Sequence, residues 1–210
     1  MPDQSLSAGP GRPKDLEKRK AILESAKNLF IRQGYASTSM DAIASEAGVS
    51  KLTVYSHFTD KETLFSAAVV ARCEEQMPAL FLPLDENLPV EALLLDIARA
   101  FQTLTNSPES LELHRLMVTL GTQDPKLSQI FFEAGPARII GEMERLLGRL
   151  AQRGELRFAS ARTAAEHFLI LVKGVCNFRL MVGCGELPDQ DSAERHVREV
   201  VELFMRAYRP

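Results

Sequence analysis

The stretch Ala47-Gly48-Val49-Ser50-Lys51-Leu52-Thr53-Val54-Tyr55-Ser56-His57-Phe58 decides the fold of the N-terminal part of this 210-residue chain. Gly48 is expected to make a tight turn, and Ser50 is expected to cap the helix that follows it. Val54 and Phe58 are four residues apart and share one helical face. Side chains that donate hydrogen bonds fall off that face, at Lys51, Thr53, Tyr55 and His57. This pattern predicts the turn and second helix of a helix-turn-helix that binds duplex DNA.

The flanking sequence extends this unit in both directions. Upstream, apolar residues repeat at three-and-four spacing before Gly34, so a helix is expected from about Leu16 to Gln33. These apolar residues are Ile22, Leu23, Ala26, Leu29 and Phe30. Thr38 and Ser39 then offer capping oxygens for a short helix that starts at Met40. Downstream, a further helix is expected to begin at Asp60-Lys61-Glu62 and to end near Pro78, followed by a connector at residues 81–84.

The combined pattern closely resembles the DNA-binding domain of the TetR family of bacterial transcriptional regulators. The resemblance covers about residues 15 to 70 in unbroken register. It rests on Ala26, Leu29-Phe30, Gly34-Tyr35, Thr38-Ser39-Met40, Ile43-Ala44, Ala47-Gly48-Val49-Ser50-Lys51, Val54-Tyr55, His57-Phe58, Lys61-Glu62 and Leu64-Phe65. One position departs from the common pattern, because Leu52 stands where many relatives have Gly. A leucine there suggests an apolar contact with the bases, for example with a thymine methyl group.

The resemblance also implies which side chains contact DNA. Phosphates would be held by Ser50, Tyr55, His57 and Lys61, with further phosphate contacts from Thr38 and Ser39 at the start of the second helix. Lys51, Leu52 and Thr53 would face the bases. Taken one at a time, these residues are also ordinary surface or half-buried residues. Their joint occurrence at the family's spacing favours the DNA-binding interpretation.

Charge is distributed unevenly along the chain. Residues 1–61 carry nine Lys and Arg against seven Asp and Glu, whereas the remainder carries 16 against 21. The basic excess therefore lies in the part expected to bind DNA, and the acidic remainder discourages indiscriminate binding. Residues 1–14 have no periodicity and are expected to form a flexible arm. Arg12, within Gly-Arg-Pro, resembles arms that insert Arg into an A·T-rich minor groove, with a disordered leader as the alternative.

Beyond residue 70 the chain is expected to be helical throughout, because Pro and Gly punctuate helical periodicity and no period-two strands occur. Helices are expected to start at Pro89, at Ser107-Pro108 and at Asp124-Pro125, with an interruption at Gly135-Pro136. The predicted fold class is therefore all-α. Its parts are an arm (1–14), a three-helix helix-turn-helix domain (15–62) and a larger helical domain for ligand binding and dimerisation (63–210).

The last two expected helices carry more apolar surface than one small domain covers. The helix from Ala164 to Val182 is apolar on almost every side, and the final helix, from about Ser192, has an apolar stripe. A twofold four-helix bundle between two chains would bury this surface, and the resemblance implies the same homodimer. The expected interface residues are Phe168, Leu171, Val175, Phe178, Val197, Val201 and Phe204. Residues from about 111 to 183 also resemble the AefR-like branch of the family.

The middle helices are expected to enclose a pocket for a small, largely apolar effector. Flexible Met and flat aromatic side chains suit such a cavity, although any one of them taken alone is more often part of an ordinary core. The candidate wall residues are Met77, Phe101, Met117, Leu120, Phe131, Phe132 and Phe168. One of five nearby polar residues could orient the ligand, and the sequence does not choose among His114, Arg115, Arg138, His167 and Asn177.

The sequence contains few features typical of metal-binding proteins, enzymes, or secreted and membrane proteins. Cys73, Cys176 and Cys184 lack metal-ligand spacing and the four histidines are scattered, so no metal and no cofactor are expected. No acid/base pair, nucleophile constellation or Gly-rich phosphate loop argues for an enzyme. No leader and no membrane-spanning apolar run are visible, which predicts a cytoplasmic bacterial protein that joins the nucleoid when it binds DNA.

These features together predict a homodimeric, DNA-binding transcriptional regulator. We expect a repressor that a small apolar effector releases from a palindromic operator. An activator or a ligand-independent regulator with the same DNA-binding domain is the first alternative. An all-helical scaffold or enzyme is the second.

Overall fold

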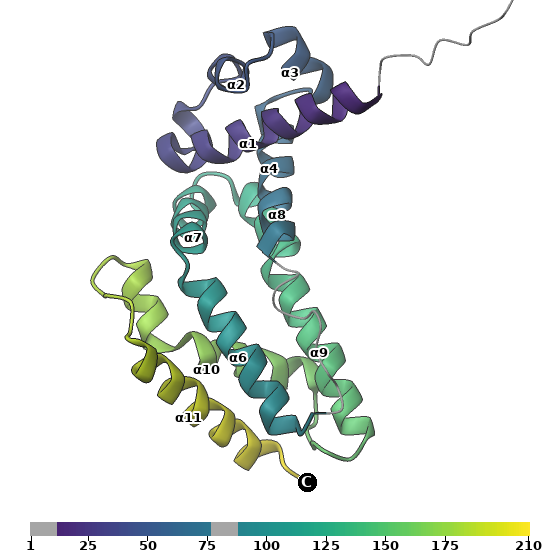
Figure 1. The fold of residues 1–210 in the computed structure, drawn as a ribbon, viewed down its shortest axis with the longest axis vertical. Coiled ribbons are helices and arrows are strands. Elements are labelled where there is room, and N and C mark those ends of the chain that lie inside the picture. Colours follow the sequence, from purple (N-terminus) through teal and green to yellow (C-terminus); the bar gives the residue numbers. More distant parts are fainter. Residues whose placement is uncertain (1–11, 77–87) are drawn as a thin grey trace, which may run out of the picture. The chain divides into compact units, whose positions relative to one another are not determined.

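The computed structural model describes residues 12–76 and 88–210, and these ranges contain helices and no β-strand (Figure 1). The chain divides into two compact units between Ala71 and Arg72. This division lies inside helix α4, Lys61–Gln76, and therefore later than the predicted boundary at residue 62. Met77, the predicted helix end near Pro78 and the predicted connector at residues 81–84 lie outside the described residues.

The first unit contains α1, α2, α3 and the first part of α4. Helix α1 spans Arg12–Ser37, but Gly34 within it has φ 78° and ψ 166°, so the regular helix breaks there as predicted. The helix begins earlier than expected, because residues 12–14, predicted as part of the flexible arm, are helical. Pro13 does not prevent this early start, since a proline in the first turn lacks only an N–H that would have no partner in the helix.

Two serines cap the short helices of the helix-turn-helix. Ser39 Oγ accepts a hydrogen bond of 3.1 Å from the Ala42 amide at the start of α2, Met40–Glu46. Ser50 Oγ accepts one of 3.1 Å from the Thr53 amide at the start of α3, Lys51–His57. Between the two helices, Gly48 adopts φ 65°, the left-handed conformation that glycine enters without a steric penalty. The predicted capping and turn are therefore confirmed.

The core of the first unit is formed by the apolar residues that the sequence spacing identified. Ile22, Ala26, Leu29 and Phe30 of α1 are buried with Ile43, Val54, Phe58, Leu64 and Phe65. The Phe65 ring meets the rings of Phe30 and Tyr35 edge-on, at centroid distances of 5.0 and 4.9 Å. Edge-to-face contacts of this kind add to the stability that burial provides. Val54 and Phe58 thus hold α3 against the unit and leave its other side exposed.

In the described residues of the second unit, the end of α4 is followed by six further helices. They are α6 (Val90–Asn106), α7 (Pro108–Gly121), α8 (Pro125–Ala134), α9 (Pro136–Gln152), α10 (Ala161–Met181) and α11 (Gln190–Tyr208). The predicted starts of α7 and α8 are confirmed, since Ser107 and Asp124 cap them and a proline occupies the first turn of each. Helices α10 and α11 begin slightly earlier than predicted, because Ser160 and Asp189 provide their caps.

Helix α10 lies at the centre of the second unit and packs against α9, α6 and α11 (Figure 1). The core is almost entirely aliphatic and aromatic, and the Phe168 ring of α10 meets the Phe204 ring of α11 edge-on at 5.1 Å. Among the helices of the described ranges, none is both long enough and apolar enough to cross a membrane.

A break at Gly174 interrupts α10. This glycine has φ 59° and ψ −174°, which removes regular helical hydrogen bonding around it. His196 of α11 compensates, because its Nε2 lies 3.1 Å from the Leu171 carbonyl oxygen and 3.0 Å from that of Val172. A Cβ atom at position 174 would lie 2.9 Å from His196 Cε1. Both the backbone conformation and the close approach of the imidazole ring therefore require glycine here.

Candidate DNA-binding surface and ligand cavity

The exposed side of α3 carries two large side chains that are accessible to solvent. The Leu52 side chain is 80% exposed and the Tyr55 side chain 43% exposed, whereas Val54 is fully buried. Ser39 and Ser50 are exposed at the starts of α2 and α3, and Thr53 is partly exposed. These are the predicted DNA-contacting residues that the structure leaves accessible. An exposed leucine on this helix fits the predicted apolar contact with a base.

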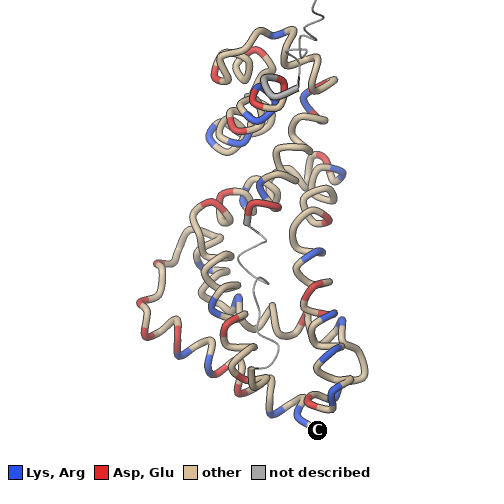
Figure 2. Tube along the Cα trace, turned by 45° about the vertical axis from the view of Figure 1, so that its right-hand side comes forward, with Lys and Arg blue, Asp and Glu red and all other residues tan. Residues whose placement is uncertain are grey.

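Lys51 is also accessible, but an acidic side chain accompanies it. Its Nζ lies 2.8 and 3.0 Å from the two carboxylate oxygens of Asp41 on α2. The hydrogen bond and the charge of Asp41 raise the pKa of Lys51 above its ordinary value. Acidic and basic residues are interspersed on the helices of this unit (Figure 2). Asp41 therefore offsets part of the positive charge that a phosphate backbone would meet.

Three predicted phosphate contacts have a different role in the structure. Thr38 is buried, and its hydroxyl donates to the carbonyl oxygens of Gly34 at 2.8 Å and Leu29 at 3.2 Å. The His57 side chain is only 11% exposed, and its Nε2 lies 3.2 Å from Asp15 Oδ1, close enough for an ion pair but without hydrogen-bond geometry. These two predictions are corrected, because both side chains face their own unit.

Lys61 also has partners within its own unit, and its predicted phosphate contact stays a prediction. Its Nζ donates to the carbonyl oxygens of Tyr35 (2.8 Å), Ala36 (3.3 Å) and Thr38 (3.0 Å), and it lies 4.4 Å from the centroid of the Tyr35 ring. A lysine ammonium has three N–H donors, so these carbonyls occupy all of them. The carbonyls at the end of α1 lack helical partners, and Lys61 supplies one. Arg12 is the first residue of α1, and its side chain lies outside the described part of the chain.

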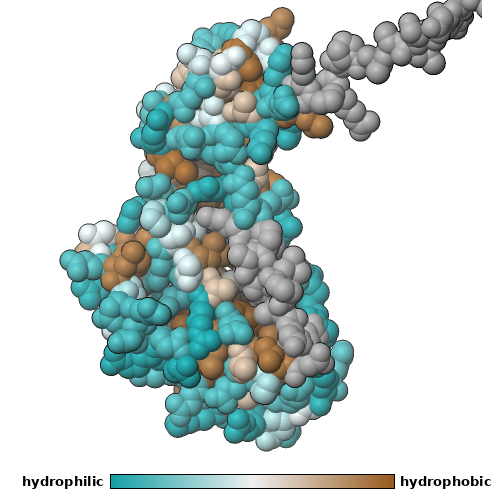
Figure 3. Space-filling model, viewed as in Figure 1, coloured by the Kyte–Doolittle hydropathy of each residue, from teal (hydrophilic) through white to brown (hydrophobic). Residues whose placement is uncertain are grey.

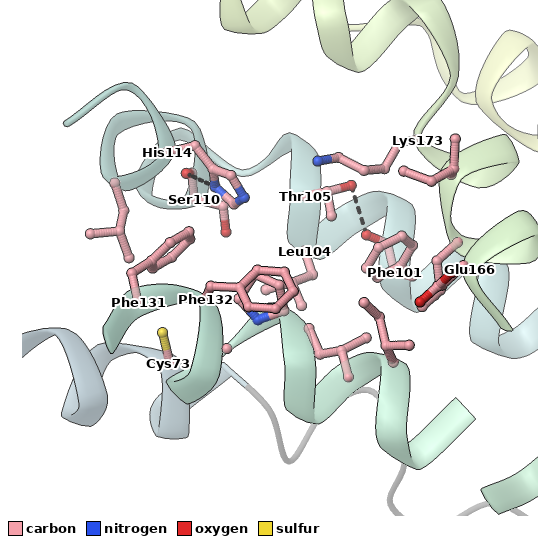
Figure 4. Close-up of a pocket in the computed structure, with 17 residues that line it drawn as sticks. Cys73, Phe101, Leu104, Thr105, Ser110, His114, Phe131, Phe132, Glu166 and Lys173 are labelled. Atoms are coloured by element: carbon pink, nitrogen blue, oxygen red, sulfur yellow. Dashed lines mark hydrogen bonds between the residues drawn. The ribbon is translucent and has the colours of Figure 1, made fainter. Parts of the chain in front are cut away.

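The second unit contains a cavity of about 440 Å³, a volume within the usual range for small-molecule sites (Figure 4). Its walls come from α6, α7, α8, α9 and α10, together with Cys73 at the end of α4. Most of the lining is apolar. Phe101, Phe131 and Phe132 line it, as predicted, along with Leu104, Leu113, Ile139, Ile140, Leu169 and Ile170.

Three other predicted wall residues do not line the cavity. Met117 and Leu120 are buried elsewhere along α7, and Phe168 is fully buried against Phe204. The reason is the same in each case, since a helix with several apolar faces can turn any of them toward a cavity. On α10 the cavity-facing side is the one with Leu169, Ile170 and Lys173. Met77 lies outside the described residues.

Of the five polar candidates, only His114 lines the cavity. Its Nδ1 lies 2.6 Å from the Ser110 carbonyl oxygen, and its ring meets Phe131 edge-on at 5.1 Å. Burial lowers the pKa of His114 and the charge of Lys173 lowers it further, while the Ser110 hydrogen bond acts in the opposite direction. The other four have contacts elsewhere: Arg115 with Met181, Arg138 with Glu74, His167 with Tyr208, and Asn177 with Thr105 and Asn106.

The second unit also exposes large apolar side chains along α10 and the neighbouring parts of α7 and α11. On the side seen in Figure 3, hydrophilic residues cover most of the surface, with apolar side chains gathered in patches. Three shallow grooves run along α10 and share Ile170. We call the exposed apolar residues of these grooves the α10 face; they are Val118, Ile170, Leu171, Val175, Phe178, Val182 and Leu203.

The structure divides the predicted interface residues into two groups. Leu171, Val175 and Phe178 belong to the α10 face, with Val175 73% and Phe178 64% exposed. Phe168, Val197, Val201 and Phe204 are at most 1% exposed, so they are core residues of their own chain and the prediction is wrong for them. The apolar stripe of α11 packs against α10 and α6, whereas Leu171, Val175 and Phe178 on the outer side of α10 are exposed.

Two sequence models of known families match the chain. The model described as bacterial regulatory proteins, tetR family, matches residues 22–68. The model described as the C-terminal domain of AefR-like transcriptional repressors matches residues 92–210, more than half of the chain. This chain belongs to the TetR family. The predicted AefR-like branch is confirmed as well.

Individual TetR-family relatives are similar to this chain, in sequence or in structure, along almost its whole length. The HTH-type transcriptional regulator YdeS of Bacillus subtilis (strain 168) is 28% identical over 195 residues, which are 91% of this chain and 89% of YdeS. The crystal structure of a TetR-family regulator from Mesorhizobium loti MAFF303099 superposes with a TM-score of 0.86, 29% identity and coverage of 95% of this chain and all of that one. The flavonoid-responsive regulator FrrA superposes with a TM-score of 0.81 and 31% identity, covering 92% and 97%.

Membership of the TetR family establishes the general activity. The chain is a transcriptional regulator with an N-terminal helix-turn-helix DNA-binding domain, and its relatives are regulators rather than enzymes. Among the described residues, no cluster of His, Cys, Asp and Glu could hold a metal ion.

Most of the other lining residues were not predicted from the sequence, and two of them, Cys73 and Lys173, have side chains that can ionise. Cys73 lies against Gly135, and burial raises the pKa of its thiol to about 11, so the thiol stays protonated and unreactive near neutral pH. Lys173 is the single charged residue in the segment Leu169-Ile170-Leu171-Val172-Lys173-Gly174-Val175. A lone lysine in an apolar helix was the signal that would have identified it.

Proposed function

We propose that this TetR-family regulator is a homodimeric repressor that a small, largely apolar effector releases from a palindromic operator. The observation that carries the proposal is the cavity of about 440 Å³ in the AefR-like domain, walled mostly by aromatic and aliphatic side chains. The description of the matching domain as that of transcriptional repressors supports repression, and the flavonoid response of FrrA supports control by a small molecule.

Helix α4 offers a physical link between effector and DNA. Near its start, Lys61 binds the carbonyls at the end of α1, and near its end, Cys73 lines the cavity against Gly135. A ligand that displaces the Cys73 end would shift this continuous helix and the helices attached to it. Shifts of one or two ångströms in a helix are a common element of such switches.

The α10 face supports the homodimer. Large apolar side chains clustered on one surface mark protein–protein contacts, and a twofold dimer uses the same surface on both chains. Two DNA-binding units held together can read two half-sites about 34 Å apart, one helical turn of DNA. Misplacing the two units relative to each other would release the operator.

The test begins with genome-wide mapping of bound DNA, which supplies an operator. Apolar metabolites and drugs are then screened for thermal stabilisation, and operator affinity is measured with each hit. A true effector weakens operator binding, and operator DNA weakens effector binding by the same factor, because linkage is reciprocal. Stabilising ligands that leave operator affinity unchanged would indicate a ligand-independent regulator, and higher expression of the target genes with the protein present would indicate an activator.

The dimer has its own test in Phe178→Arg, which places a charge in the proposed interface. We expect self-association to weaken by at least about 100-fold, because an unpaired buried charge costs several kcal/mol, and operator affinity to fall with it. Leu187→Arg is the matched control, since Leu187 is also exposed but lines none of the three grooves. Sedimentation compares the self-association of the two variants. A wild type that is monomeric at micromolar concentration would contradict the proposal.

A further inference from the structure

Lys173 lines the ligand cavity and one groove of the α10 face, and the described part of the chain supplies no partner for its charge. It is partly buried on α10, among apolar neighbours in sequence and space. Among residues 12–76 and 88–210, it forms no hydrogen bond and no ion pair. Burial lowers the pKa of Lys173 below the ordinary value of 10.5, as expected when nothing nearby stabilises the ammonium.

The other polar groups of the cavity do not compensate this charge. Figure 4 shows the Lys173 nitrogen directed toward His114 and Thr105 and away from Glu166. Glu166, the acidic residue of the described lining, is paired with Arg162, whose Nε lies 2.7 Å from its carboxylate. Thr105 donates its hydroxyl to the Phe101 carbonyl oxygen at 2.9 Å.

His114 supplies no negative charge to Lys173. When the ring is neutral and Nδ1 donates to Ser110, Nε2 is an uncharged acceptor, and no hydrogen bond joins it to Lys173 within the described residues. A protonated His114 would add a second positive charge beside Lys173, which is why Lys173 lowers the pKa of His114. Within residues 12–76 and 88–210, the end of the cavity near Lys173 and His114 therefore carries an unpaired positive charge.

We propose that the cavity selects apolar molecules that carry one anionic head group, which pairs with Lys173 while the apolar body lies against the phenylalanines. Burying a charge costs free energy unless the charge is paired. A ligand that places an anion beside Lys173 removes this cost, so its binding is stronger by the free energy of the new ion pair. The inference rests on the proposed effector site. It narrows the expected class of ligand from largely apolar molecules in general to amphipathic acids.

Matched ligands test the head group on the full-length protein. We would measure affinities by calorimetry for two acids and their neutral counterparts, namely decanoate against decan-1-ol and 2-naphthoate against methyl 2-naphthoate. At least one acid is expected to bind about tenfold or more tightly than its counterpart. Decylamine, which carries the opposite charge, is expected to bind at least about 100-fold more weakly than decanoate.

Lys173→Met tests the residue. It keeps an apolar side chain of similar length, and it should weaken binding of the preferred acid by about 10- to 100-fold while changing its neutral counterpart by less than about threefold. Lys173→Arg keeps the positive charge and should retain the preference for the acid. Lys126→Met is the matched control, because Lys126 is an exposed lysine on α8 that does not line the cavity. Thermal unfolding of each variant checks that the fold is intact.

The outcomes separate this inference from the proposed function. Wild-type protein that binds neither acid more tightly than its neutral counterpart, or a preference that survives Lys173→Met, overturns the anionic head group. Binding of decan-1-ol that releases operator DNA would keep the effector function and overturn only this inference. Acid binding that depends on Lys173 but leaves operator affinity unchanged would support this inference and overturn the effector function.

Discussion

Lys61 in the first unit and Lys173 in the second are both partly buried, yet their surroundings differ completely. Lys61 donates to three carbonyl oxygens at the end of α1, whereas Lys173 has no partner within the described residues. Both ammonium groups lose hydration, but only one regains its hydrogen bonds from the protein. The difference indicates that Lys61 stabilises the fold, and it fits the proposal that the unpaired ammonium of Lys173 binds the anionic group of a ligand.

The apolar residues of the two units show the same contrast. Among the described side chains of the first unit, the exposed large apolar ones are Leu16 near the start of α1 and Leu52 and Tyr55 on the outer side of α3. The second unit leaves the whole α10 face uncovered. The second unit therefore retains the exposed apolar surface that the proposed dimer would cover.

The largest effect expected from this contrast concerns two phenylalanines of the second unit. Phe204→Ala should lower the free energy of unfolding by about 3–5 kcal/mol, because its buried ring packs against Phe168 and Tyr208. Phe178→Ala should lower it by about 0.5 kcal/mol or less in the monomer, because the ring is mostly exposed. Urea denaturation, at protein concentrations low enough for both variants to be monomeric, measures the two free energies of unfolding. Similar losses at the two positions would show that the α10 face is part of the monomer's own core.

A smaller effect is expected at Lys61. Lys61→Met should lower the free energy of unfolding of the first unit by about 1–2 kcal/mol, because three carbonyls lose a charged donor. It should leave the salt dependence of operator binding unchanged. Tyr55→Phe is the comparison, since it should weaken DNA binding without affecting stability. A salt slope reduced by about 0.9 in Lys61→Met would confirm this lysine as a phosphate contact.

The smallest effect is expected at Asp41. Asp41→Asn removes the carboxylate that pairs with Lys51, so affinity for DNA should rise by roughly 3- to 10-fold at low salt and less at high salt. Glu24→Gln removes an equivalent charge from α1, where Glu24 pairs with Lys27, and serves as the control. Operator titrations at several salt concentrations measure both. Equal affinities for Asp41→Asn and wild type would mean that Asp41 does not limit DNA binding.

Features encoded locally could be predicted from the sequence. Ser39 and Ser50 cap the helices that follow them, and the prolines at 108 and 125 begin their helices, because a cap or a first-turn proline depends only on the residues next to it. The spacing of Val54 and Phe58 likewise determined which side of α3 is buried.

Features that depend on neighbouring helices could not be predicted. Helix α10 is apolar almost all round, so its sequence does not reveal that Phe168 faces the core and Phe178 the surface. The role of Lys61 depends on the position of the end of α1, which local spacing does not give. The break at Gly174 depends on an imidazole ring that belongs to α11.

Ile170 lines the cavity and all three grooves of the α10 face. A mutation at Ile170 that altered ligand choice would alter chain pairing in the same step, whereas Phe131 and Ile139 line the cavity and none of the grooves. As descendants of this regulator diverge toward new signals, we therefore expect inherited changes to accumulate on α8 and α9. The outer side of α10 would stay under purifying selection for partner choice.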